Sequence, residues 1–378
     1  MLPKLQEFDM NFDTHKPVRI ITGDNCICEN SALFASLGKR AMIVSGKTSA
    51  DRCGAMADIA EALAKEGITY VRFAGIPENP PAPICHEVGR TAREEGCDFV
   101  IAIGGGSALD GAKAIAAYAA NPQCGVMDIF DDSIRTNDGL PLIAVPTTAG
   151  TGSEACRYSV LTIDGGARKK TYKHSSAYPK FAFVCPRYSA TMNRKYTVST
   201  ALDALAHAIE SYFSPKSCAA SEEAALYAAK EIWDVLFCAT PADFTAEHRA
   251  RLAYAATAAG IAIDYTGTGF PHPLGYSITL TRGIPHGSAC AIFEGAFLRY
   301  NMLTEEGEKR AHALAEALGT TAEDMIERIP SMSGIDLKIG ADEREELIDR
   351  VAGAGNYANS PYVISRGEMS DIYARLFG

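Results

Sequence analysis

The chain has 378 residues, of which 47% are hydrophobic and 22% are charged. This composition excludes a disordered or fibrous chain, and the length favours two domains. With 36 Lys and Arg against 46 Asp and Glu, the formal net charge is −10. Such a chain is a poor general binder of nucleic acid or of an anionic membrane surface, and neither is an expected partner.

The cysteines and the N-terminal residues indicate the compartment. Eleven cysteines are scattered along the chain without a Cys-x-x-Cys pair, which argues against a zinc ribbon and against a secreted disulfide framework. Reduced thiols in a cytoplasmic protein are the simpler interpretation. The first residues hold no apolar segment of the signal-peptide type, and no run approaches the roughly 18 apolar residues of a membrane span.

The first half of the chain alternates strand and helix patterns. Strands are expected at Val18–Thr22, Ala41–Ser45, Thr69–Ala74, Phe99–Ile103 and Leu142–Val145, and helices at Ala55–Glu66 and His86–Glu95. This order predicts a Rossmann-like parallel sheet covered on both faces. The segment 157–186, with the turn Asp164-Gly165-Gly166, is expected to form an attached β-hairpin.

The second half is dominated by Ala-rich helical patterns with few strand signals. Helices are expected at Thr200–Phe213, Ser221–Phe237, Thr245–Ile263, Ser288–Tyr300, Glu305–Ala317 and Asp342–Ala352. We therefore predict an α/β domain over residues 1–190 and an all-α domain over residues 191–378.

Two loops have the composition of phosphate- or sugar-binding segments. Gly104-Gly105-Gly106-Ser107 follows a predicted strand and opens a helix, so a phosphate would meet flexible backbone and free N–H groups. Pro146–Glu154 carries four hydroxyl groups and two glycines directly after another strand. A plain tight turn and a polar capping loop are the alternatives, but together the loops predict a ligand at one edge of the sheet.

Four side chains form a candidate metal site. Asp203 and His207 are four residues apart and share one face of an Ala- and Leu-rich helix. His272 and His286 each follow a proline and are expected on stiff loops at helix edges. One carboxylate and three imidazoles suit iron(II), zinc, manganese or nickel. An Asp–His hydrogen bond on the helix and two ordinary loop histidines are the alternatives.

In this combination and order, the motifs resemble those of the iron-containing (group III) alcohol dehydrogenases, which are related to glycerol dehydrogenase and dehydroquinate synthase. The resemblance spans nearly the whole chain. It implies an N-terminal dinucleotide domain, a C-terminal metal domain, and an NAD(P)-linked alcohol dehydrogenase or aldehyde reductase. Hydride would pass between an alcohol carbon and nicotinamide C4 while one divalent ion, Fe(II) or Zn(II), holds the substrate oxygen as a Lewis acid. Members of the family often form homodimers.

The resemblance also implies roles for individual residues. The metal ligands would be Asp203, His207, His272 and His286. The dinucleotide contacts that it implies are Gly105, Gly106, Ser107, Thr147, Thr148, Ser153 and Lys169. In the same loops we also expect contacts from Gly46, Lys47, Ser49, Gly104, Asp110 and Thr151. Many members carry a second loop histidine where this chain has Tyr276, which leaves Tyr276 as the candidate for contact with the substrate.

A few positions of the sequence bear on which cofactor and which class of substrate the protein binds. NAD enzymes of the family tend to carry Asp just after the second strand, where its charge would repel a 2′-phosphate. This chain has Gly46 there, followed by Lys47 and Ser49, which favours NADP(H) over NAD(H). The alternatives are a relative that acts on a polyol or phosphorylated substrate, although few basic residues flank the metal motifs, and a non-catalytic nucleotide-binding protein.

Overall fold

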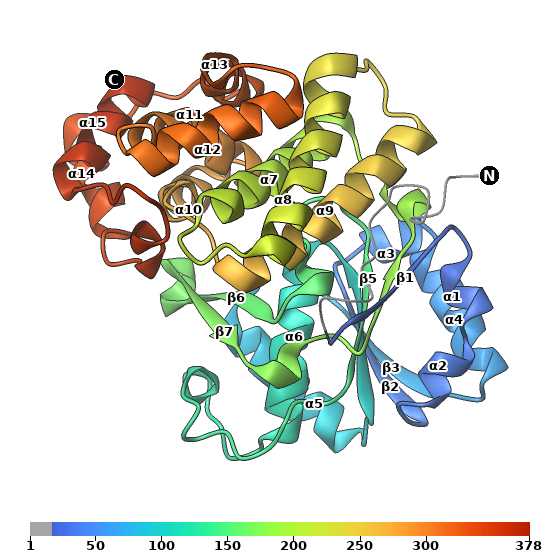
Figure 1. Ribbon diagram of the computed structural model, residues 1–378. Coiled ribbons are helices and arrows are strands. Elements are labelled where there is room, and N and C mark those ends of the chain that lie inside the picture. Colours follow the sequence, from blue (N-terminus) through green and yellow to red (C-terminus); the bar gives the residue numbers. More distant parts are fainter. Residues whose placement is uncertain (1–16) are drawn as a thin grey trace. The chain divides into compact units, whose positions relative to one another are not determined.

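The computed structural model describes residues 17–378, which divide into two compact units (Figure 1). Unit 1 comprises the chain up to Met192 together with Phe244–Thr257. Unit 2 comprises Asn193–Asp243 and Ala258–Gly378. The predicted domain boundary after residue 190 took no account of a return of the chain to the first unit.

A parallel sheet forms the centre of unit 1. Its strand order is β1-β8-β5-β4-β2-β3, and every neighbouring pair is parallel. The strands are β1 (Arg19–Thr22), β2 (Arg40–Ser45), β3 (Thr69–Ala74), β4 (Phe99–Gly104), β5 (Leu142–Pro146) and β8 (Phe181–Val184). The predicted α/β class and the five predicted strands are confirmed.

The predicted β-hairpin is shorter than the segment assigned to it. β6 (Tyr158–Ile163) and β7 (Arg168–Lys173) pair antiparallel around the predicted turn. Phe181–Val184, which was included in the hairpin, instead forms β8 between β1 and β5. Three of its four residues are buried, because a strand inside a parallel sheet is covered on both faces.

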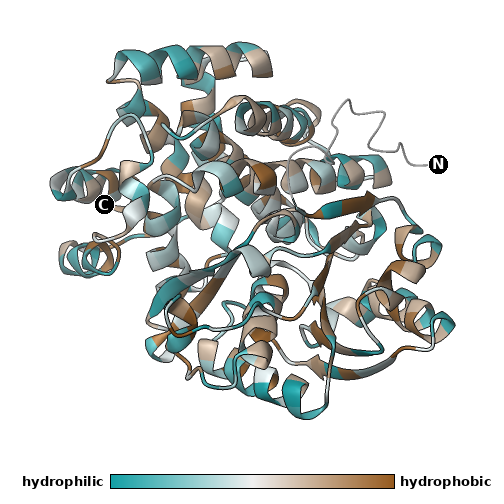
Figure 2. Ribbon diagram, turned by 60° about the horizontal axis from the view of Figure 1, so that its bottom comes forward, coloured by the Kyte–Doolittle hydropathy of each residue, from teal (hydrophilic) through white to brown (hydrophobic). Residues whose placement is uncertain are grey.

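Helices cover both faces of the sheet. They are α1 (Cys26–Glu29), α2 (Ala32–Ala35), α3 (Ser49–Arg52), α4 (Ala55–Lys65), α5 (Ala82–Glu94) and α6 (Gly106–Ala120). Along β4, Val100 and Ala102 join the core with α5 and α6, whereas Ile101 and Ile103 join the core with α4. This alternation follows from the two-residue period of a strand. Figure 2 shows the strands of the sheet as predominantly hydrophobic.

Unit 1 is completed by the first part of α9 (Ala246–Thr266). Arg249 donates hydrogen bonds to the carbonyl groups of Ser189 and Met192. Thr257 Oγ1 donates to Oε1 of the buried Glu154 at 2.7 Å, and burial raises the pKa of that carboxyl group. Residues distant in sequence therefore satisfy polar groups of the first unit.

Unit 2 is helical, as expected. Its helices are α7 (Arg194–Phe213), α8 (Ala219–Trp233), η8 (Asp234–Ala239), the second part of α9, α10 (Pro271–Arg282), α11 (His286–Asn301), α12 (Glu305–Leu318), α13 (Ala322–Met332), α14 (Ala341–Asp349), η9 (Gly355–Ala358) and α15 (Arg366–Phe377). Across residues 17–378, the helices lack the combination of length and apolar character needed to cross a membrane.

Two helices of unit 2, α10 and α13, were not predicted. The prediction that His272 lies on a loop is wrong, because His272 lies in the first turn of α10. Proline is tolerated in the first turn of a helix, where its missing N–H needs no partner, so Pro271 and Pro273 begin this helix rather than prevent it. His286 is likewise the first residue of α11, directly after Pro285.

Close contact between α5 and α6 requires a glycine at position 89. A Cβ atom on Gly89 would lie 2.6 Å from Tyr118 Cβ and 3.0 Å from Ile115 O. We predict that Gly89→Ala lowers the free energy of unfolding by about 1–3 kcal/mol through overpacking. Gly367→Ala on α15, where only Ser365 Oγ lies nearby at 3.9 Å, should be neutral or slightly stabilising. Urea unfolding followed by circular dichroism compares the two, and equal effects would contradict the packing argument.

Candidate metal centre and dinucleotide-binding edge

The predicted dinucleotide loops lie at one edge of the sheet in unit 1. β2, β4 and β5 are neighbouring parallel strands, so their carboxyl ends meet at the same edge. Gly46 follows β2, Gly105 follows β4 and Thr147 follows β5. Ligands of open α/β sheets bind outside the carboxyl ends of the strands, so this edge is the candidate cofactor site.

The glycine turn and the threonine loop pack directly against each other. A Cβ atom on Gly105 would lie 3.0 Å from Thr148 Cγ2, and one on Gly106 would lie 2.5 Å from Thr151 Cγ2. Thr147 N donates to Gly104 O at 2.9 Å. The neighbouring loop therefore requires glycine at both positions, because any side chain there would collide with Thr148 or Thr151.

A buried polar network fixes this edge from beneath. Ser153 Oγ donates to Asp110 Oδ1 at 2.6 Å, and Val160 N donates to Asp110 Oδ2 at 2.9 Å. Lys113 Nζ donates to Ser153 Oγ at 2.7 Å and to Tyr158 O at 2.6 Å. The sequence analysis missed Lys113, although the spacing Asp110-x-x-Lys113 on an otherwise apolar helix was a signal. Asp110 and Ser153, two of the predicted cofactor contacts, are thus hydrogen-bonded to other groups of the protein.

The remaining predicted cofactor contacts are more accessible. Ser107 is half-buried, and its Oγ accepts a hydrogen bond from Asn79 N at 3.1 Å. Lys47 and Ser49 are exposed, and Lys169 on β7 is half-buried. A Cβ atom on Gly46 would meet Ser49 Oγ only at 3.5 Å, so this position has room for a side chain.

Burial raises the pKa of Asp110, and the nearby charges of Lys113 and Lys169 oppose that shift.

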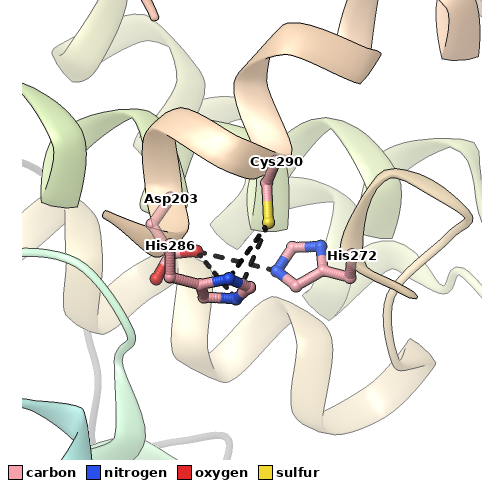
Figure 3. Close-up of side chains that lie close together, drawn as sticks. All are labelled: Asp203, His272, His286 and Cys290. Atoms are coloured by element: carbon pink, nitrogen blue, oxygen red, sulfur yellow. Dashed lines mark hydrogen bonds and ion pairs between the residues drawn. The ribbon is translucent and has the colours of Figure 1, made fainter. Parts of the chain in front are cut away.

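Three helices of unit 2 bring the predicted metal ligands together. Asp203 and His207 lie on α7, His272 on α10 and His286 on α11. Asp203 Oδ1 lies 3.7 Å from His272 Nε2 and 3.7 Å from His286 Nε2. Figure 3 shows the carboxylate and these two imidazoles directed toward one another.

Two further side chains border this group. The ring of His207 stacks on that of His272, with centroids 4.5 Å apart and planes at 18°. His207 is nevertheless outside the set of ligand atoms that lie within 4.8 Å of one another, and Cys290 is inside that set. The ring of Tyr276 stacks on that of His286 at 5.0 Å. The sequence analysis missed Cys290, because a lone cysteine on a helix reads as an ordinary core residue.

Glu210 orients His272 from behind. Its Oε1 lies 2.5 Å from His272 Nδ1, and its Oε2 accepts a hydrogen bond from Gly269 N at 2.5 Å. A histidine that donates through Nδ1 presents Nε2 to a metal. Although burial disfavours the charged imidazole, the carboxylates of Glu210 and Asp203 together outweigh burial and raise the pKa of His272 to about 9. The sequence signal that we overlooked is the spacing of residues 203, 207 and 210 on one helix face.

The pKa values of two buried carboxyl groups shift in opposite directions. Although burial acts to raise it, the pKa of Asp203 is held below its usual range by the histidines of the cluster. The pKa of Glu294 is raised well above its usual range by burial and by the adjacent Glu210. The shift of Asp203 favours its carboxylate form, which is an oxygen ligand for a cation.

Two atoms of the cluster lack the partner that burial demands. Within residues 17–378, Asp203 Oδ1 and His272 Nε2 make no hydrogen bond, although both are buried. A buried polar atom without a partner costs about 1–3 kcal/mol. A divalent cation would satisfy both atoms at once, and oxygen and imidazole ligands are those that Zn(II) and Fe(II) take. The residues present fit a metal ion.

Comparison with known proteins identifies the family of the chain. The family model described as iron-containing alcohol dehydrogenase matches residues 17–186, and the model of the C-terminal part of that family matches residues 197–376. A crystal structure of an iron-containing alcohol dehydrogenase from Thermotoga maritima superposes with a TM-score of 0.89 at 29% identity, covering 97% of this chain and 100% of that one.

Curated relatives differ in the cofactor that they use. An NADPH-dependent butanol dehydrogenase of Clostridium saccharobutylicum is 29% identical over 89% of this chain and 91% of its own length. A probable NADH-dependent butanol dehydrogenase of Bacillus subtilis is 27% identical over 88% of both chains.

The geometry of the cluster depends on Gly287, which lets α11 approach α7. A Cβ atom on Gly287 would lie 1.8 Å from Ser199 O and 2.8 Å from Asp203 Cβ. We predict that Gly287→Ala separates the helices, lowers the melting temperature and reduces the metal content of the purified protein. The control is Gly353→Ala, which has no atom within 4 Å of the added methyl group. Differential scanning calorimetry and elemental analysis test both variants, and unchanged metal content in Gly287→Ala would contradict the prediction.

Proposed function

Because the chain belongs to the iron-containing alcohol dehydrogenase family, we propose that it interconverts an alcohol and an aldehyde at a metal held by Asp203, His272 and His286. His207 is the fourth ligand of the set that the family implies. The main support is that donor atoms from three helices converge. Two of these atoms, Asp203 Oδ1 and His272 Nε2, are buried without a hydrogen bond. The substrate is a small alcohol or aldehyde.

The ion, when bound, supplies a Lewis acid for the substrate oxygen, and the nicotinamide supplies the hydride acceptor or donor. Glu210 keeps Nε2 of His272 directed toward the ion through the contact at Nδ1. Asp203 contributes a negative charge to the site, which lowers the net charge of a bound cation. Tyr276, beside His286, is the side chain that we place next to the substrate.

The carboxyl edge of the sheet in unit 1 is the proposed dinucleotide site. The N-terminus of α6, with Gly105 and Gly106, would receive the pyrophosphate on its free N–H groups. The network of Asp110, Lys113 and Ser153 holds this helix to the loop after β5, which keeps the edge rigid when the cofactor binds. The homodimer and the cytoplasmic location stay predictions.

We propose NADP(H) as the preferred cofactor. The turn after β2 carries no carboxylate, and it offers the cation of Lys47 and the hydroxyl of Ser49 beside Gly46. A 2′-phosphate would meet no like charge in this turn. Relatives of both preferences occur at similar identity, so local chemistry rather than family membership carries this proposal.

The metal role is tested with His272→Ala. This change removes a buried donor, so we expect loss of the bound metal and a fall in kcat/KM of more than about a thousandfold, since a Lewis acid contributes several kcal/mol. Cofactor affinity, measured by fluorescence titration, should stay unchanged, because the proposed dinucleotide site lies in unit 1.

His312→Ala, which removes an exposed histidine, is the control for that variant and should retain both metal and activity. Full activity of the wild-type protein after rigorous metal removal would refute the metal role.

The cofactor preference is tested with Gly46→Asp. The new carboxylate has room beside Ser49, and we expect it to lower the kcat/KM ratio of NADPH to NADH by about tenfold, which corresponds to a repulsion of about 1.4 kcal/mol. Gly353→Asp adds the same charge in unit 2 and should leave the ratio unchanged. Equal ratios in wild-type and Gly46→Asp proteins would refute the proposal.

A further inference from the structure

Glu294 is a buried acidic side chain that the proposed reaction does not use. It lies on α11, its exposed fraction is 0%, and within residues 17–378 neither of its carboxyl oxygens accepts a hydrogen bond from a donor. An ionised carboxylate without a donor or a cation is expensive in a dry interior, so such a group takes up a proton and becomes neutral. The O–H group that results needs an acceptor of its own.

Glu210 on α7 offers that acceptor. Its side chain is also fully buried, and it is in hydrogen-bonding contact with the side chain of Glu294. Oε1 of Glu210 lies 2.5 Å from His272 Nδ1, and Oε2 accepts the hydrogen bond from Gly269 N at 2.5 Å. Each oxygen of Glu210 thus faces an N–H donor, and the Glu294 carboxyl group is a further neighbour of the same carboxylate.

The contact between these two carboxyl groups requires a proton. Two adjacent carboxylates in a low-dielectric interior repel each other, so one of the two groups is protonated. Glu210 faces a donor at each oxygen, which stabilises its charged form, whereas Glu294 receives no donor. The proton therefore belongs on Glu294. In agreement with this assignment, burial and the adjacent Glu210 raise the pKa of Glu294 well above its usual range.

We propose that Glu294 is a carboxylic acid that donates a hydrogen bond to Glu210 and so positions the metal ligand His272, an inference that rests on the proposed function. Glu294 is a positioning residue, because it acts on the metal only through Glu210 and His272. The hydrogen bond from His272 Nδ1 to Glu210 leaves His272 Nε2 for the ion. Helix α11 thereby contributes twice to the site, through His286 and, about two turns later, through Glu294.

Two substitutions of Glu294 separate the donated hydrogen bond from packing. Glu294→Leu fills most of the space without an O–H donor, so we expect Zn(II) to bind about 10–100-fold more weakly, the usual effect of losing a group that orients a histidine ligand. Glu294→Gln keeps the size of the side chain, and its amide N–H can donate to Glu210. We therefore expect Glu294→Gln to bind Zn(II) with an affinity close to that of the wild-type protein.

The experiment combines zinc affinity with infrared spectroscopy of the full-length protein. Competition with a chromophoric chelator gives the Kd of Zn(II) for the wild-type protein and for each variant, and circular dichroism establishes that each variant is folded. The infrared spectrum of the metal-free protein is recorded near neutral pH. We expect the C=O stretching band of a carboxylic acid in the difference spectrum of wild-type minus Glu294→Gln protein. Glu327→Gln, which removes an exposed carboxylate, is the control and should change neither the Kd nor this band.

The outcomes separate the role of Glu294 from the proposed function. A difference spectrum without the acid band, wild-type affinity in Glu294→Leu, or equal losses of affinity in Glu294→Leu and Glu294→Gln would overturn the role of Glu294 alone. The infrared measurement needs neither metal nor Glu294→Leu, so it tests the proposal even if that variant does not fold. Failure of the wild-type protein to bind zinc would overturn the proposed function and, with it, the positioning of a metal ligand.

Discussion

The helical unit depends on a buried carboxylate that faces imidazoles rather than an arginine or lysine. Asp203 lies in a core of alanine and leucine side chains, where an isolated negative charge is expensive. Histidines of the cluster keep it ionised, and Glu210 in turn orients His272. The helices that carry these groups must approach closely, which explains the glycine beside His286. The cluster can therefore form only if α7 packs closely against α11.

Two buried polar clusters, one in each unit, are satisfied in different ways. In unit 1, Lys113, Asp110 and Ser153 bond to one another and to the backbone. In unit 2, Asp203 and His272 each keep an atom without a hydrogen bond. A network closed by protein groups serves the scaffold, because no valence is left for a ligand. The unpaired donor atoms of Asp203 and His272 lie at the proposed metal site.

Periodicity predicted the elements whose environment is uniform. The continuous apolar run of β4 and the regular pattern of α4 were evident because each is buried in a simple way. β8 was not predicted as a separate strand, because its four residues are too few to show a repeating pattern of apolar side chains. The spacing of Asp203 and His207 on α7 suggested candidate metal ligands, whereas nothing local pointed to Cys290, because only the folding of α11 against its neighbours brings its sulfur near Asp203. Tertiary contacts of single side chains leave no trace in local patterns.

The division of unit 1 into two separate stretches of sequence has a consequence for biosynthesis. The last strand of the sheet ends at Val184, but Arg249 and Thr257, which bond to Met192 and Glu154, are made only after α7 and α8. During synthesis, the first unit therefore lacks the hydrogen bond from Thr257 to Glu154 until α7, α8 and most of α9 have been made. A fragment cut near residue 190 would lack Arg249 and Thr257, and with them the side-chain hydrogen bonds that α9 supplies to the first unit.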